Sequence, residues 1–232
     1  MANELETKNT DYVASAARAI LDGVPFVGSL LAELAGSLIP NQRIDRVAKF
    51  AVLLEARLST LEKEALSRQA RDPAGADLLE EALRQAASSL SDDRRERIAS
   101  LIANGLSEGE VSYLESKHLL KILGELSDAE LIWLRSHLHD EIDGDSEFRE
   151  KHSSVLNLPA AHLGSSQPDL DKNTVGESYR QHLVRTGLLE NRYRTDPKTK
   201  ELKVDSHGRL QVQRRTITSL GRLLLRVIDG GQ

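Results

Sequence analysis

Residues 41–71 read NQRIDRVAKFAVLLEARLSTLEKEALSRQAR, and apolar side chains recur along this stretch at alternating spacings of three and four. The spacing places them on one face and predicts a single long helix, with Asn41 as its N-cap. The face forms a heptad seam, which is typical of helices that pair. We expect an oligomerisation seam, or packing inside the same chain, through Ile44, Val47, Ala51, Leu54, Leu58 and Leu61.

Apolar periodicity also predicts helices on both sides of this stretch. Two short helices are predicted over residues 11–21 and 26–39, and two more over residues 74–90 and 91–105. Aromatic residues make up only 3% of the chain. The core must therefore consist of Leu, Ile, Val and Ala, as in helix bundles.

Two sequence patterns mark the starts of further helices. Ser107 with Glu110, and Ser127 with Glu130, have the spacing of capping boxes, in which each side chain satisfies a backbone N–H of the first turn. Each box satisfies two backbone donors that would otherwise lack partners. We therefore expect helices from residue 107 to about 123 and from residue 127 to about 138.

The C-terminal part of the chain predicts a different architecture. Residues 140–173 lack periodicity and indicate a loop. The segments that follow are expected to be a helix, a strand, a turn-rich wing, a second strand and a closing helix capped by Thr218, over residues 174–187, 188–194, 195–209, 210–217 and 218–228. This order predicts a winged-helix-like module. The fold class is thus mainly α, with a helical domain over residues 1–106 and a winged-helix-like domain over residues 107–232.

Charge is distributed unevenly along the chain. The net charge is −5, yet residues 178–232 contain 12 Lys or Arg and only 5 Asp or Glu. A basic module on an acidic body favours contact with a polyanion at the C-terminal end. If that module binds nucleic acid, the helix and the wing would supply Arg180, Gln181, Arg185, Arg192, Arg194, Lys198, Lys200, Lys203 and Arg209.

The most apolar segment lies between residues 20 and 40, but it is about half the length of a membrane span. It could act on a membrane or a partner protein, or it could be buried in the bundle. The residues that would make the membrane or partner contact are Val24, Phe26, Val27, Leu30 and Leu31. The N-terminal residues lack the basic and apolar regions of a signal peptide. We expect a cytoplasmic protein that associates with a membrane, if at all, on activation.

Several kinds of chemistry are not indicated by the sequence. The chain has no cysteine, which excludes disulfides, thiolate metal sites and cysteine nucleophiles. His and Asp residues cluster over residues 137–152 without the spacing of a calcium loop, and we expect them to be solvated. No P-loop, GxSxG, GxGxxG or HExxH pattern is present. We therefore expect a non-enzymatic protein without a cofactor, a metal or a small-molecule substrate.

Three further stretches resemble a known family. They are HLLKILGELSDAELIWL (residues 118–134), YRQHLVRTGLL (residues 179–189) and RTITSLGRLLLRVI (residues 215–228). Their order resembles the C-terminal region of bacterial abortive-infection alpha-like proteins, and GVPFVGSLLAELAGSLIPNQRIDRVAKF (residues 23–50) is similar to the start of small bacterial proteins associated with them. The resemblance implies antiphage defence and carries over no catalytic residue.

Three functions follow as expectations. The first is a non-enzymatic antiphage protein, whose helical half acts on a membrane or partner while the C-terminal module senses or docks. The second is a winged-helix DNA-binding regulator. The third is a structural adaptor that self-associates.

Overall fold

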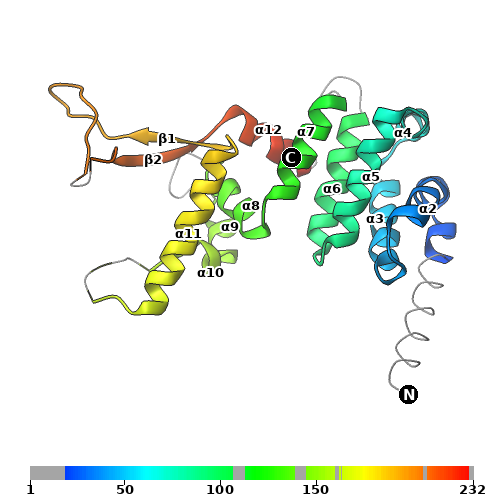
Figure 1. The fold of residues 1–232 in the computed structure, drawn as a ribbon, viewed down its shortest axis with the longest axis horizontal. Coiled ribbons are helices and arrows are strands. Elements are labelled where there is room, and N and C mark those ends of the chain that lie inside the picture. Colours follow the sequence, from blue (N-terminus) through cyan, green and yellow to red (C-terminus); the bar gives the residue numbers. More distant parts are fainter. Residues whose placement is uncertain are drawn as a thin grey trace, which may run out of the picture. The chain divides into compact units, whose positions relative to one another are not determined.

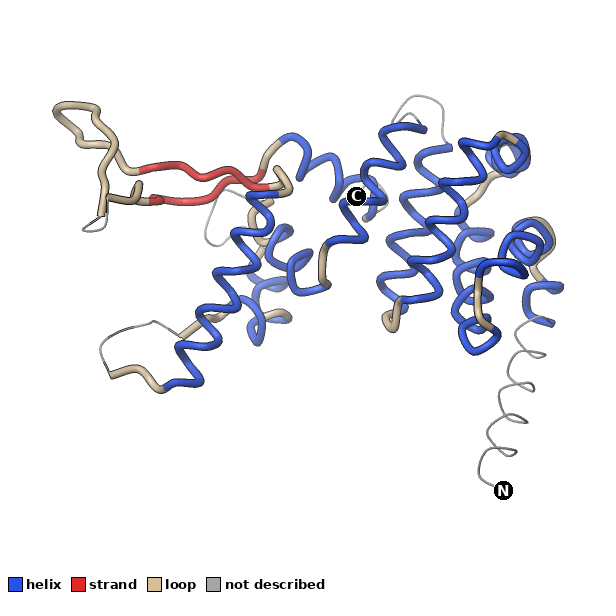
Figure 2. Tube along the Cα trace, in the orientation of Figure 1, coloured by secondary structure: helices blue, strands red, loops and turns tan. Residues whose placement is uncertain are grey.

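The computed structural model describes residues 19–106, 113–138, 145–159, 162, 164–205 and 208–229. Over these ranges the protein is mainly helical, with one small antiparallel sheet near the C-terminal end (Figures 1 and 2), so the coarse fold class is confirmed. The chain divides into two compact units. Unit 1 contains Met1–Glu125 and Arg226–Gln232, and unit 2 contains Leu126–Leu225.

Unit 1 is built from helices. Residues 19–23 are helical, and the elements that follow are α2 (Val27–Leu38), the 3-10 turn η1 (Asn41–Arg43), α3 (Ile44–Arg57), α4 (Thr60–Arg71), α5 (Pro73–Ser88), α6 (Asp92–Leu106) and α7 (Tyr113–Glu125). The helix α7 belongs to unit 1 because it packs on α5 and α6, where Gln85 Nε2 donates to the Leu120 carbonyl oxygen over 3.0 Å. The two compact units divide after Glu125, and the domain boundary expected after residue 106 stays a prediction.

The predicted helix over residues 41–71 is wrong in two respects. It is two helices, because the chain is extended at Leu58 and Ser59 then caps α4. The Ser59 side chain accepts from the Glu62 N–H, and the Glu62 carboxylate accepts from the Ser59 N–H over 2.7 Å. Asn41 is not an N-cap, since it lies in η1. A capping box thus interrupts the seam, and it places Leu61 on the surface with 77% exposure.

Helix α3 supplies much of the core of unit 1. It packs against α2, α5 and α6, and its Val47, Phe50, Ala51 and Leu54 side chains are completely buried. Leu and Ala side chains of α5 and α6 cover the other side of this core. Burial of apolar surface is the main force that stabilises such a unit.

In its described residues, unit 2 contains four helices before its sheet. The elements are α8 (Asp128–Arg135), α9 (Ser146–Lys151), α10 (Ser153–Leu156), α11 (Gln167–Arg185), β1 (Leu189–Tyr193), β2 (Val212–Ile217) and α12 (Ser219–Ile228), whose last turn belongs to unit 1. The capping box at Ser127 and the cap at Thr218 are both confirmed. The Glu130 N–H donates to Ser127 Oγ over 3.2 Å, and the Gly221 N–H donates to Thr218 Oγ1 over 3.1 Å.

The predicted loop over residues 140–173 is wrong in part, although residues 157–159 and 164–166 are irregular as expected. Residues 146–156 form α9 and α10, and α11 begins at Gln167, seven residues before Thr174. The side chain of Ser166 caps α11 by accepting from the Asp169 N–H. Gly176 lies so close to Leu158 that a Cβ at this position would be 2.3 Å from Leu158 Cδ1. Capping and this close approach stabilise a helix whose first half has no apolar stripe.

Helix α11 is held between α8 and the sheet. His182 Nδ1 lies 2.6 Å from Glu130 Oε1, which joins α11 to the first turn of α8. Burial raises the pKa of the Glu130 carboxyl, but hydrogen bonds from Ser127 and His182 outweigh burial and bring this pKa below its usual value. Gly187 then adopts a φ of 75°, which favours glycine, and turns the chain from α11 into β1.

Candidate nucleic-acid interface

Residues 189–217 form a β-hairpin, here called the hairpin arm, which is described except for residues 206–207. Figures 1 and 2 show the arm extending away from the helices of its own unit. Leu189 pairs with Ile217 at its base, and both are buried. Toward the tip the strands pass into solvent. Both predicted strands are confirmed, to within two residues at each end.

The tip of the arm is ordered by backbone hydrogen bonds. The Arg194 N–H donates to the Gln211 carbonyl, the Lys203 N–H donates to the Arg194 carbonyl, and the Gln211 N–H donates to the Lys203 carbonyl, each over 2.9 Å. The turn is closed by Asp196, whose Oδ1 accepts from the Lys198 N–H over 2.8 Å. Hydrogen bonds from this N–H and the next one lower the pKa of the Asp196 carboxyl. The basic side chains therefore stand on a defined scaffold.

The arm carries an excess of positive charge. It contains eight Lys or Arg and four Asp or Glu. Two of the cations form ion pairs on the arm: Arg192 lies 2.5 Å from Glu190, and Lys203 lies 3.8 Å from Asp196. The remaining predicted contacts on the arm are all exposed, and none forms an ion pair with a described residue: Arg194, Lys198, Lys200 and Arg209.

Two arginines face each other across the strands. Arg192 on β1 is the direct partner of Arg214 on β2. Like charges directly opposite each other destabilise a sheet. Glu190 offsets the charge of Arg192, whereas Arg214 has no ion-pair partner among the described residues. An anion bound between the two guanidinium groups would relieve this repulsion.

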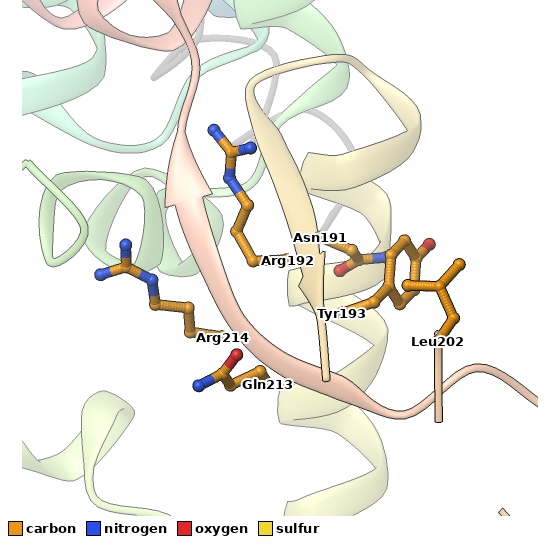
Figure 3. A pocket seen from close by; sticks show the side chains of 6 residues that line it. All are labelled: Asn191, Arg192, Tyr193, Leu202, Gln213 and Arg214. Carbon is orange, nitrogen blue, oxygen red and sulfur yellow. The ribbon is translucent and has the colours of Figure 1, made fainter. Parts of the chain in front are cut away.

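A shallow hollow of about 490 Å³ lies at the same level of the ribbon, lined by Asn191, Arg192, Tyr193, Leu202, Gln213 and Arg214. Figure 3 shows the two arginine side chains on one side of the ribbon, and those of Asn191, Tyr193 and Leu202 on the other. The Asn191 Oδ1 atom accepts no hydrogen bond from any described residue. Arginine side chains thus lie on one side of the ribbon, and amide, aromatic and aliphatic side chains lie on the other.

The predicted contacts on α11 are only partly available. Arg180 does not face solvent freely: its guanidinium lies 4.9 Å from the centre of the Trp133 ring and 3.2 Å from the Glu177 carboxylate. The expectation that it reaches bases or phosphates stays a prediction, and in this conformation the side chain is packed against α8. Gln181 and Arg185 are exposed, and Gln181 Nε2 donates to Glu177 over 3.3 Å.

A compact charge cluster supports the base of the arm. Glu177 on α11 accepts from Arg215 on β2 and also pairs with Arg180. Both guanidinium groups keep an Nε atom that is buried and has no hydrogen-bond partner among the described residues. Burial lowers the pKa of Arg180, and Arg215 adds to this effect while Glu177 opposes it. One carboxylate therefore pairs with two arginines and links α11 to β2.

His137 lies beside this cluster, and its Nδ1 is 2.8 Å from the Trp133 carbonyl oxygen. Burial lowers the pKa of His137, and the nearby Arg149, Arg180 and Arg215 lower it further. The neutral imidazole is thus the form that the folded unit favours. Of the other His and Asp residues considered as a metal cluster, His139, Asp140 and Asp143 lie outside the described residues.

The predicted seam and the apolar N-terminal segment are largely interior. Five of the six seam residues are buried within unit 1, so this seam packs inside the chain. In the apolar segment Val24, Val27 and Leu31 are buried, whereas Phe26 and Leu30 are half-buried. No helix in the described part of the chain combines the length and the apolar character needed to cross a membrane. The membrane-acting defence role expected from this segment stays a prediction.

Sequence reasoning missed five residues of the interface: Asn191, Tyr193, Leu202, Gln213 and Arg214. Arg214 could have been found from the strand alternation, but only once the register placed it opposite Arg192.

Compared with known proteins, the chain matches no family model, no curated protein sequence and no solved structure. The geometry of the hairpin arm therefore carries the functional argument alone.

Proposed function

We propose that this protein binds nucleic acid through the hairpin arm, with the phosphate backbone held by Arg192 and Arg214 and by the exposed cations nearer the tip. The observation that carries the proposal is the cross-strand arginine pair on an exposed arm whose net charge is positive. Lysine and arginine contacts to phosphate supply most of the sequence-independent affinity for nucleic acid.

The element order of unit 2 supports a winged-helix-like binding mode. Helices α8, α9 with α10, and α11 precede β1, the tip of the arm and β2, which is the order of a winged helix. In that comparison α11 corresponds to the recognition helix and the hairpin arm to the wing. Because Arg180 is packed on Trp133, the arm rather than α11 supplies the main contacts.

Fluorescence anisotropy with a labelled 20-nucleotide DNA, used as a single strand and as a duplex, tests the proposal. The affinity is expected to fall as salt rises, because bound arginines release counterions. The double substitution Arg192→Ala with Arg214→Ala should weaken binding at low salt and reduce the slope of log K against log salt by about one to two units.

The matched control removes the same charge elsewhere. Arg68 and Arg71 are exposed in the last turns of α4, and changing both to alanine should leave binding nearly unchanged. Absence of binding to either DNA at low salt would contradict the proposal. Equal loss of affinity in the two double variants would contradict it too, since it would show only an effect of total charge.

A further inference from the structure

Resting on that proposed function, we infer that the hollow beside Tyr193 takes an unpaired nucleobase, so that the hairpin arm holds a single strand in preference to a duplex. Arg192 and Arg214 also line this hollow, but the inference concerns its aromatic and amide groups, and the ligand is a base. It predicts which nucleic acid the arm binds and which side chain selects it.

The lining of the hollow is chemically suited to a nucleobase, which has a flat aromatic face and polar edges. The Tyr193 ring is 36% exposed, and it lies on the same side of the ribbon as Leu202 and Asn191 (Figure 3). An exposed aromatic ring on a basic surface is the usual platform on which unpaired bases stack. Asn191 also borders the hollow, and its buried Oδ1 has no hydrogen-bond partner among the described residues. The volume of about 490 Å³ is in the range of small-ligand sites.

The exposure of Tyr193 belongs to a wider pattern. Apolar side chains that a folded protein would normally cover remain exposed along the arm, namely Tyr193, Leu202, Val204, Leu210 and Val212. They alternate with the cations in a short stretch of chain. Exposed apolar groups interleaved with cations are suited to a ligand that has both flat apolar faces and negative charge, as a nucleic acid strand has.

The placement of the side chains favours a single strand. The arginines and Tyr193 project from opposite sides of a two-stranded ribbon (Figure 3), so a ligand that meets both must bend around the ribbon edge. A single strand is flexible and can place phosphates on one side and a base on the other. A duplex is stiff over about 150 base pairs and keeps its bases paired and stacked, so it reaches the arginines alone.

Anisotropy with three probes of equal length tests the inference: oligodeoxythymidine, an abasic strand with the same number of phosphates, and a duplex. Wild-type protein should bind oligodeoxythymidine on the order of ten-fold more tightly than the abasic strand. Tyr193→Ala should remove most of this difference and leave abasic-strand and duplex binding unchanged. Tyr193→Phe keeps the ring and should retain the preference.

The possible failures are distinguishable. If no probe binds, the proposed function fails together with the inference. If oligodeoxythymidine and the abasic strand bind equally and Tyr193→Ala changes neither, the base site is wrong while phosphate binding stands. If Tyr193→Ala weakens all three probes equally, Tyr193 acts through the shape of the arm, and the inference is also overturned. Gln213→Ala, at another residue that lines the hollow, keeps the ring and should retain the preference for oligodeoxythymidine.

Discussion

Helix α3 and the hairpin arm use similar apolar side chains in opposite ways. Leu54 in α3 is completely buried, whereas Leu202 in the arm is 52% exposed. The first contributes its full transfer free energy to folding, and the second contributes about half of it. The apolar residues of the arm stay partly exposed, which leaves them available for contact. The comparison separates the part of the chain that maintains the fold from the part that is available to a ligand.

The largest expected effect is in α3. Leu54→Ala removes a completely buried side chain and should lower the free energy of unfolding by about 2–5 kcal/mol. Urea unfolding followed by far-UV circular dichroism measures this change. Leu61→Ala is the control, because Leu61 belongs to the same predicted seam and is 77% exposed; a change within about 0.5 kcal/mol is expected there. Equal effects of the two variants would show that the seam is not divided as described.

The next effect should arise at the base of the arm. Glu177→Gln leaves Arg180 and Arg215 side by side without their shared carboxylate, and it should destabilise unit 2 by about 1–2 kcal/mol, since Glu177 is partly exposed. Trp133 is the only tryptophan of the chain and lies in unit 2, so its fluorescence reports this transition. Glu190→Gln, which removes an exposed pair with Arg192, should cost less than about 0.5 kcal/mol. A larger loss of stability in Glu190→Gln than in Glu177→Gln would contradict the role given to Glu177.

A smaller effect is expected from mild acid. The folded pKa of His137 is lowered, first by burial and then by nearby arginines, so the folded state favours the neutral ring. Its contribution is complete above the unfolded pKa of about 6.5 and is lost as pH falls from there toward the folded pKa. The stability reported by Trp133 should therefore decrease between about pH 7.5 and pH 5.5. His137→Asn keeps a donor near the Trp133 carbonyl and should make stability depend less on pH in this range. If the variant loses as much stability as wild type does, the decrease is due to other titrating groups.

The smallest effect should be on the arm itself. Val204 is 53% exposed, and Val204→Ala should change the free energy of unfolding by no more than about 0.5 kcal/mol. Thermal unfolding of the variant beside wild type is a sufficient measurement. A loss comparable to that of Leu54→Ala would mean that the arm is covered in the folded protein, and the contrast with α3 would disappear.

Local signals in the sequence predicted much of the fold. The capping box at Ser127, the cap at Thr218 and the two strands depend on neighbouring residues, and all are present. The break before α4 had the same kind of signal, Ser59 with Glu62, but the continuing apolar spacing concealed it. The early start of α11 was missed because Gln167–Thr174 has a polar composition typical of a loop.

The candidate site was harder to predict, because it depends on contacts between distant residues. Nothing local indicates that Glu177 meets Arg215, 38 positions away, or that Arg180 lies on Trp133. These contacts decide which of the predicted cationic side chains are held by other residues of the protein and which can contact a ligand. The pairing of Arg192 with Arg214 likewise requires a strand register, which residue types alone do not set.

The division of the chain has a practical consequence for taking the protein apart. Residues 226–228, at the end of α12, belong with the N-terminal helices, and Asn104 Nδ2 donates to the Val227 carbonyl over 2.7 Å. The second unit is thus an insertion within the first. Shortening the gene from its 3′ end therefore removes part of the N-terminal unit as well. Excising the insertion, and joining its flanks with a short linker, keeps the residues of each unit together.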